Sequence, residues 1–233
     1  MSYTNTFFKN IVHLLYPEIC AGCGSDLLSA NQLVCGECMN GLPVTDFYLH
    51  QDNPVEKIFR GRLPLVTASA HVYFTKDSLV QNLLHRLKYG GNREVGIYLG
   101  QLMGEKLKSC TWYNDLHALI PLPLHFSRQK KRGYNQAALI CEGISSVMNV
   151  PVLNDVIARR KNTETQTRKS RMERWNNIES KFELKRARGI MNKHVLLIDD
   201  VITTGATLEA CGAELLKAEG LRLSIAAFAY TSL

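Results

Sequence analysis

The sequence predicts an α/β protein in which a parallel sheet is flanked by helices and preceded by a small cysteine-rich segment. Three observations predict this fold class. From about Leu116 onward, short apolar runs alternate with stretches of helical periodicity, which is typical of a parallel sheet covered on both faces. Four of the seven cysteines fall within the first 50 residues. The 233 residues, 45% hydrophobic and 21% charged, suit one large folded domain with a small satellite.

The order of the elements divides the chain into three segments. Residues 1–50 form the cysteine-rich segment, which opens with apolar residues at helical spacing from Phe7 to Leu15. Residues 51–115 form a mainly helical hood or linker. In it, one helix starts at Asp77 or Ser78 and ends at Gly90-Gly91, and a second carries apolar residues from Val95 to Leu107.

Residues 116–233 form the predicted α/β core. Its expected elements are a strand over 116–120, a basic loop over 128–133, a helix over 135–148, a short strand over 152–158, a long loop over 161–177, a strand over 194–198, a helix over 206–218 and a strand over 223–229. Loops as long as that over 161–177 are usually functional or disordered.

No apolar stretch approaches the ~18–20 residues that a membrane helix needs. The N-terminus lacks a basic cluster followed by an apolar run, so we expect no secretory signal and a cytoplasmic protein. The net charge of +7 is uneven, because residues 128–193 hold 16 Lys and Arg against 6 Asp and Glu. Such a stretch suits a phosphorylated small molecule, pyrophosphate or nucleic acid, although a solvated basic surface is the plain alternative.

Two Cys-x-x-Cys pairs lie eleven residues apart, Cys20 with Cys23 and Cys35 with Cys38. This spacing lets each pair hold one side of a tetrahedral ion, and four thiolates leave no open coordination position. The pattern therefore predicts a structural zinc site. An iron–sulfur cluster and redox disulfides are the alternatives, and disulfides conflict with a cytoplasmic location.

The most informative stretch runs from Val195 to Leu208. A buried strand delivers Asp199 and Asp200 to its carboxyl end, where ligands bind in open parallel sheets. A Thr- and Gly-rich loop and a helix follow, so backbone N–H groups converge on an anion. Adjacent carboxylates repel a phosphate unless the ligand also carries hydroxyls. The stretch thus predicts a phosphorylated pentose, with an unliganded acidic turn as the alternative.

This stretch resembles the phosphoribosyl pyrophosphate (PRPP) motif of type I phosphoribosyltransferases: four apolar residues, two acids, the apolar pair Val201 and Ile202, and T-T-G-x-T. Other segments are similar to the ComF family, also called the GntX or competence-protein family. They are the four cysteines, the run 87–90 (LKYG), the run 121–125 (PLPLH), the run 131–137 (KRGYNQA), and Gln166-Thr167 with Arg171, Arg174, Asn177 and Phe182 downstream. The resemblance spans Cys20 to about Ala229.

The resemblance implies a type I phosphoribosyltransferase-like fold with an N-terminal zinc ribbon. It implies that Asp199 and Asp200 hold the ribose hydroxyls, that residues 122–132 replace the pyrophosphate-binding loop, and that residues 161–177 replace the flexible catalytic loop. The candidate catalytic residues are Asp199, Asp200 and Arg171. The candidate PRPP-binding residues are Val201, Thr203, Thr204, Gly205, Ala206, Thr207, Arg128, Lys131, Arg132 and Lys88, although Lys88 is equally suited to capping its helix.

Phosphoribosyl transfer makes C1 of the ribose cation-like while pyrophosphate leaves, so the reaction needs cations at the leaving group and exclusion of water. Arg128, Lys130, Lys131 and Arg132 supply cations, and Mg²⁺ would bridge pyrophosphate and the ribose hydroxyls. The hood shows no base-recognition pattern. Tyr89 or Tyr134 would stack on an acceptor base if either is not part of the core.

Two hypotheses for the function follow. The first is a phosphoribosyltransferase that uses PRPP and Mg²⁺ with an unnamed acceptor. The second is a non-catalytic, single-stranded-DNA-binding adaptor with a ligand-sensing phosphate site, since the resemblance implies DNA uptake in natural transformation. Partners would then include single-stranded DNA, a competence helicase of the ComFA type and other DNA-processing proteins. Aromatic residues are sparse in the basic stretch, which weakens the case for a stacking platform.

Overall fold

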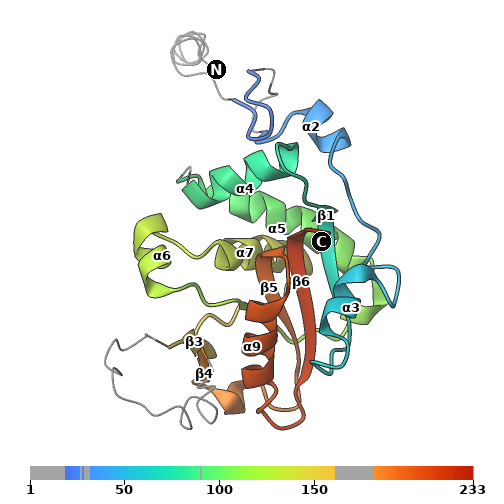
Figure 1. Cartoon of the computed structure of the whole chain (residues 1–233), viewed down its shortest axis with the longest axis vertical. Helices are drawn as coiled ribbons and strands as arrows, with labels where there is room; N and C mark the ends of the chain where they lie inside the picture. The colour runs from blue at the N-terminus through green and yellow to red at the C-terminus, as the bar shows by residue number, and fades with distance from the viewer. Residues whose placement is uncertain (1–18, 27, 29–31, 90, 161–180, 233) are drawn as a thin grey trace, which may run out of the picture.

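The computed structural model describes residues 19–26, 28, 32–89, 91–160 and 181–232. Its centre is a four-stranded parallel sheet in the order β1-β6-β5-β2, which confirms the predicted α/β class (Figure 1). The strands are β1 (Ala68–Tyr73), β2 (Ala118–Pro121), β5 (His194–Ile202) and β6 (Arg222–Tyr230). A separate antiparallel hairpin joins β3 (Ile157–Arg159) to β4 (Phe182–Leu184).

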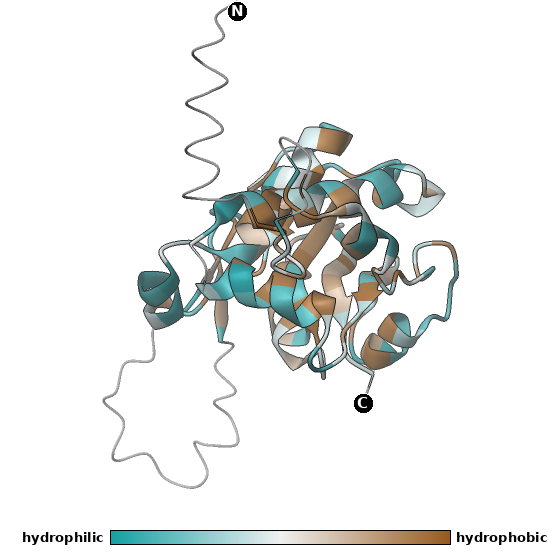
Figure 2. Cartoon of the chain, turned by 90° about the horizontal axis from the view of Figure 1, so that it is seen from above, coloured by the Kyte–Doolittle hydropathy of each residue, from teal (hydrophilic) through white to brown (hydrophobic). Residues whose placement is uncertain are grey.

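Helices cover both faces of the sheet because alternate strand residues are apolar on both sides. On β5, Leu196 and Ile198 belong to one core cluster, whereas Val195 and Leu197 belong to the other. The first cluster packs under α4 (Leu79–Tyr89), α5 (Arg93–Lys108) and α7 (Gln136–Met148), and the second under α3 (Pro54–Phe59) and α9 (Ala206–Leu215). Figure 2 shows helices that are hydrophobic along one side and hydrophilic along another.

Side-chain caps set where the predicted helices begin. Ser78 Oγ accepts the N–H of Gln81 at the start of α4, so Ser78 is the capping residue of the two that the sequence offers. Asn135 Oδ1 accepts the N–H of Ala137 at the start of α7, while its Nδ2 donates to the carbonyl of Leu122. The second bond ties the start of α7 to the chain that leaves β2.

The basic segment after β2 is a helix, α6 (Phe126–Arg132), and the expected loop over 128–133 is therefore wrong. His125 caps its start, no residue within it breaks a helix, and Gly133 ends it at φ 78°. The expected strand over 152–158 is also shorter than predicted, because only Val152 bridges Leu119 before β3 begins at Ile157.

The segment 51–115 contributes a strand and a short helix that the sequence analysis did not predict. β1 pairs with β6 at one edge of the sheet, so this mainly helical segment also builds part of the core sheet. α3 begins at Pro54 after Asn53, whose side chain accepts the N–H groups of Val55 and Glu56. Two turns of 3₁₀ helix, η1 (Thr111–Tyr113) and η2 (Ala187–Gly189), lie in connections.

Two sequence predictions lie outside the described residues. They are the helix over Phe7–Leu15 and the long loop over 161–177, which includes Gln166, Thr167, Arg171, Arg174 and Asn177. None of the helices in the described part of the chain has the length and hydropathy of a membrane span.

Candidate functional site

The carboxyl end of β5 presents two desolvated acidic side chains. Asp199 Oδ1 accepts the backbone N–H of Asp200 at 2.8 Å. Burial and the adjacent negative charge of Asp200 raise the pKa of the Asp199 carboxyl well above its ordinary value. The pair therefore requires a cation or hydroxyl donors from outside the strand.

Lys88, from the last turn of α4, supplies a cation. Its Nζ lies 2.7 Å from Asp200 Oδ2, and the two side chains are 25% and 15% exposed. Among the described residues no hydrogen-bond donor of normal geometry reaches that oxygen, so this ion pair is its main partner. The structure thus brings Lys88, a candidate from the sequence, to the acidic pair rather than leaving it as a plain surface residue.

The loop after β5 places a helix N-terminus beside the acidic pair. Thr203 and Thr204 are exposed, and Gly205 adopts φ 72° as the N-cap of α9 without a side-chain capping bond. A Cβ on Gly205 would lie 2.7 Å from Ile58 of α3, so both the backbone angle and the space require glycine. The first N–H groups of α9, from Ala206 and Thr207, can therefore donate hydrogen bonds to an anion. The N–H of Ala206 also donates a long bond of 3.5 Å to Thr204 Oγ1.

The basic residues of α6 divide into exposed and anchored side chains. Arg128, Lys130 and Lys131 are exposed to solvent. Arg132 is half-buried: its Nη1 donates to Gln136 at 2.8 Å, and its guanidinium lies 5.4 Å from the centre of the Tyr89 ring. This contact joins α6 to the end of α4, next to Lys88.

The structure distinguishes the two tyrosines that the sequence offers for base stacking. Tyr134 is buried, and its hydroxyl donates to the carbonyl of Leu87 at 2.8 Å, so its ring packs in the core. Tyr89 is 57% exposed. A hydrogen bond from Arg132 and the charges of Arg132, Lys131 and Lys88 lower the pKa of Tyr89. Only Tyr89 of the pair offers an accessible ring.

A cavity of about 480 Å³ is bounded by α6, α7 and β3. The residues of the acidic pair and of the loop over 203–207 do not line it. One of its walls carries Arg159, which the sequence analysis missed. The available signal was weak: Arg159, Arg160 and Lys161 form a basic run just before the predicted long loop. Arg171, the third predicted catalytic residue, lies outside the described residues.

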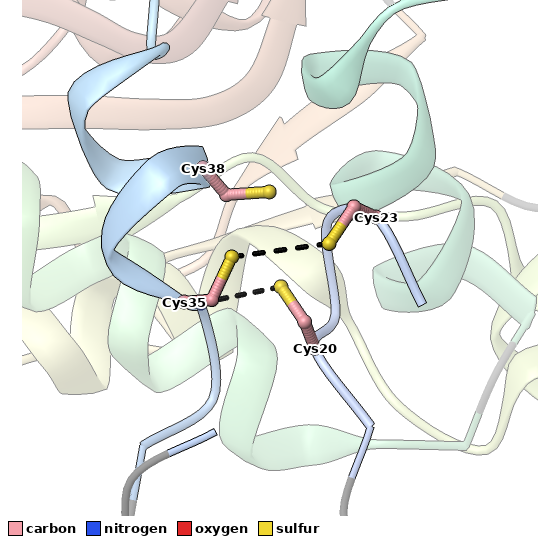
Figure 3. Close-up of side chains that lie close together, drawn as sticks. All are labelled: Cys20, Cys23, Cys35 and Cys38. Carbon is pink, nitrogen blue, oxygen red and sulfur yellow. Dashed lines mark hydrogen bonds between the residues drawn. The ribbon is translucent and has the colours of Figure 1, made fainter. Parts of the chain in front are cut away.

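The four cysteines of the N-terminal segment converge on one point (Figure 3). Their Sγ atoms all lie within 4.8 Å of one another, and those of Cys23 and Cys35 are 3.8 Å apart. Four thiolates around a tetrahedral zinc with bonds of about 2.3 Å are separated by about 3.8 Å. The cluster can therefore hold a metal ion of this kind.

The thiols of this cluster are electrostatically unequal. Burial disfavours the thiolate of Cys20, but N–H donors of Cys35, Cys23 and Gly22 outweigh it and lower its pKa to about 6. The N–H of Cys35 approaches Cys20 Sγ to 3.2 Å. Burial and the neighbouring sulfurs raise the pKa of Cys38 well above its ordinary value. A bound cation would relieve that repulsion by stabilising every thiolate.

Comparison with known proteins defines the class of the core. The phosphoribosyl transferase domain family matches residues 135–232, which include the acidic pair and the loop that follows it. Among solved structures, the chain is similar to the glutamine PRPP amidotransferase of B. subtilis (14% identity, TM-score 0.42, 60% of this chain and 30% of that one). It is also similar to adenine phosphoribosyltransferase of Leishmania donovani (12% identity, TM-score 0.37, 76% and 69%).

Curated relatives narrow the class to a family. Competence protein F of Haemophilus influenzae is 32% identical over 190 residues, covering 81% of this chain and 74% of the relative. Competence protein ComFC of Bacillus subtilis is 30% identical over 220 residues (92% and 85%). DNA utilization protein YhgH of Escherichia coli O157:H7 is 28% identical over 205 residues (85% and 84%). This chain belongs to the ComF family.

Proposed function

We propose that this ComF-family protein binds PRPP together with Mg²⁺ and acts, as a phosphoribosyltransferase-like protein, in the handling of DNA taken up by the cell. One observation carries the ligand assignment. The acidic pair at the end of β5 is followed by the N-terminus of α9, where the N-cap position requires Gly205, which has no side chain to cap the helix. Carboxylates that can accept hydrogen bonds from hydroxyl groups lie next to a site for an anion. This combination matches a ribose that carries a phosphate.

Each part of the ligand has a proposed set of partners. The 5′-phosphate would bind N–H groups and hydroxyls of residues 203–207, at the N-terminus of α9. Asp199 and Asp200 would accept hydrogen bonds from the ribose hydroxyls. Lys88 and the α6 residues Arg128, Lys131 and Arg132 would face the pyrophosphate. Mg²⁺ favours carboxylate and phosphate oxygens and would neutralise the pyrophosphate when bound.

The chemistry open to this site is cleavage of the bond between C1 of the ribose and the pyrophosphate oxygen. The electron pair of that bond leaves with pyrophosphate, and an acceptor nitrogen supplies the pair for the new bond to C1. The α6 cations would stabilise the leaving group, while the acidic pair would hold the sugar. Tyr89, exposed beside Lys88, is the proposed stacking surface for a planar acceptor.

Thermal unfolding with and without PRPP and Mg²⁺ tests the ligand assignment. At a hundredfold excess over Kd, the ligand should add about 2.7 kcal/mol of stability. For a chain of this size we expect a rise in Tm of roughly 5–11 °C, given the usual entropy of unfolding. The Asp199→Asn/Asp200→Asn variant should lose most of this rise. Wild-type protein without a shift would refute PRPP binding.

Catalysis is tested separately, by following pyrophosphate release with a broad panel of purine, pyrimidine and pyridine bases. Release that depends on one class of base, and on both Asp199 and Asp200, would support an enzyme. PRPP binding without release from any base would favour the ligand-sensing adaptor instead.

We propose zinc as the ion held by Cys20, Cys23, Cys35 and Cys38. Four cysteine ligands are typical of structural zinc, and a fully thiolate site leaves no position for substrate. An iron–sulfur cluster is the alternative, and it would be visible as absorbance between 400 and 450 nm. Metal analysis of the purified protein should give one zinc per chain and a colourless solution.

The names of the relatives support the role in DNA handling. Single-stranded DNA is the proposed macromolecular ligand, and a helicase of the ComFA type is the proposed partner. One surface feature favours direct DNA binding: the aromatic residues Tyr89 and Phe126 are exposed next to the basic side chains of α6. Affinity for oligo-dT should fall steeply with salt. Absence of binding at low salt would exclude this second function.

A further inference from the structure

The guanidinium of Arg159 packs on an aromatic ring of the β3–β4 hairpin, and Arg159 lines the cavity described above. Arg159 is the last residue of β3 and pairs with Phe182 of β4 in the hairpin register. The side chain is half-buried, and its guanidinium lies 5.5 Å from the centre of the Phe182 ring, which is fully buried. Packing on Phe182 holds the side chain in place without neutralising it.

No carboxylate in the described part of the chain forms an ion pair with Arg159. The surroundings of Arg159 act on its pKa in both directions. Burial and the positive charge of Arg128 lower the pKa of Arg159, whereas Cys211 and Asp199 act in the opposite direction. A partly desolvated cation that faces a second cation is unfavourable unless an anion joins them.

Space for such an anion is present. Arg159 lines the cavity of about 480 Å³ between α6, α7 and β3, together with Phe126 and Gln129 of α6. The lining also includes Arg93 and the exposed side chain of Glu142. Arg128 lies on α6 between Phe126 and Gln129, and its side chain is exposed. Arg159 thus lies in the lining of the cavity, and α6, the helix that carries Arg128, forms part of the same lining.

We infer that Arg159 of β3 and Arg128 of α6 together bind a diphosphate group at the mouth of this cavity. This inference rests on the proposed function, and it adds a binding residue from the β3–β4 hairpin to it. Two planar guanidinium groups can each offer a pair of N–H donors to a phosphate, which an ammonium cannot do. This arrangement would suit a ligand whose sugar lies at Asp199 on β5 and whose diphosphate extends toward α6.

Isothermal titration of the full chain with separate parts of the ligand tests this arrangement. Inorganic pyrophosphate probes the two guanidinium groups, and ribose 5-phosphate probes the acidic pair and the loop over 203–207. Arg159→Gln should weaken pyrophosphate binding at least tenfold and leave the Kd of ribose 5-phosphate unchanged within twofold. Arg159→Lys should retain only part of the affinity, because it keeps the charge but loses the paired donors.

Arg160→Gln is the matched control, since it removes the same charge one residue along, from an exposed side chain. It should leave pyrophosphate binding within twofold of wild type. Without ligand, Arg159→Gln should unfold at the wild-type temperature or above it, because an unneutralised cation is removed. A Tm several degrees lower would instead indicate that Arg159 is structural.

The outcomes separate this inference from the proposed function. Equal pyrophosphate affinity in wild type and Arg159→Gln would overturn the inference while leaving ribose 5-phosphate binding, and thus the proposed site, intact. A loss confined to oligo-dT binding would also overturn it, because the anion would then be a nucleic-acid phosphate. Wild-type protein that binds neither small ligand would refute both.

Discussion

At the scale of single residues, the ion pair between Lys88 and Asp200 connects the hood to the core site. Lys88 comes from α4 and Asp200 from β5, and the two are joined at 2.7 Å in a largely desolvated position. Asp200 adjoins Asp199, whose own charge is disfavoured by burial. The positive charge of Lys88 therefore offsets the repulsion between the two adjacent carboxylates in the protein without ligand.

We expect Lys88→Gln to lower the free energy of unfolding by about 1–3 kcal/mol, because Asp200 is left without its counter-ion. In the Lys88→Gln/Asp200→Asn double variant most of that loss should be recovered. Urea unfolding at pH 7.5 measures both values. Lys130→Gln, on the exposed surface of α6, is the control. Additive losses in the double variant would show that the ion pair contributes nothing.

At the scale of elements, the close packing of α5 against α7 depends on glycine. Gly96, Gly100 and Gly104 recur every four residues on one side of α5. A Cβ on Gly100 would lie 2.1 Å from the carbonyl oxygen of Ile140, and one on Gly143 would lie 2.0 Å from that of Ile97. The backbones therefore touch, and α7 is held where Asn135 anchors it to the end of β2.

Gly100→Ala should therefore destabilise the protein by about 3 kcal/mol, the upper end for overpacking, because backbone atoms cannot yield as a side chain would. The control is Gly189→Ala, where nothing lies within 4 Å of the added methyl and φ is not positive. That variant should unfold within about 0.5 kcal/mol of wild type. Chemical denaturation of wild type and the two variants measures these free energies of unfolding. An unchanged free energy of unfolding in Gly100→Ala would mean that α5 and α7 can move apart without cost.

At the scale of the whole molecule, the cysteine segment is part of the main core rather than a separate appendage. Cys20, Cys35 and Cys38 belong to the same hydrophobic cluster as α4, α5 and α7. Asn82 of α4 donates to the carbonyl of Gly22 at 3.0 Å, and the Tyr98 hydroxyl of α5 donates to Met39 Sδ at 2.9 Å. Loss of the proposed metal ion should therefore affect the hood helices, and with them the position of Lys88.

Removal of the proposed zinc by a strong chelator should lower the free energy of unfolding by several kcal/mol, since the energy of metal binding is coupled to folding. It should also weaken PRPP binding through α4. Cys38→Ser should reproduce both effects, whereas Cys110→Ser, which lies outside the cluster, should keep one metal per chain. Metal analysis and thermal unfolding together check this. Unchanged unfolding after complete zinc loss would contradict it.

Local patterns in the sequence determined the fold class, the cysteine cluster and the loop at the end of β5. The alternation of strands and helices predicts the parallel sheet, because both faces of each strand must be apolar. Residue type places the start of α4 at Asp77 or Ser78, and the structure selects Ser78. The spacing of the four cysteines predicts that they cluster. The two acids at the end of β5, followed by threonines and a glycine, predict the loop before α9, since these residues are close in the chain.

Only the tertiary structure decided the features that depend on distant partners. β1 carries buried polar residues, Ser69 and His71, that hide its strand pattern. Tyr113 and Tyr48 satisfy them from far along the chain, with contacts of 2.9 and 2.7 Å. The ion pair of Lys88 and the placement of Arg159 likewise join elements remote in sequence. The partners in these hydrogen bonds and ion pairs are far apart in the sequence. Local periodicity therefore cannot predict which of these residues are in contact.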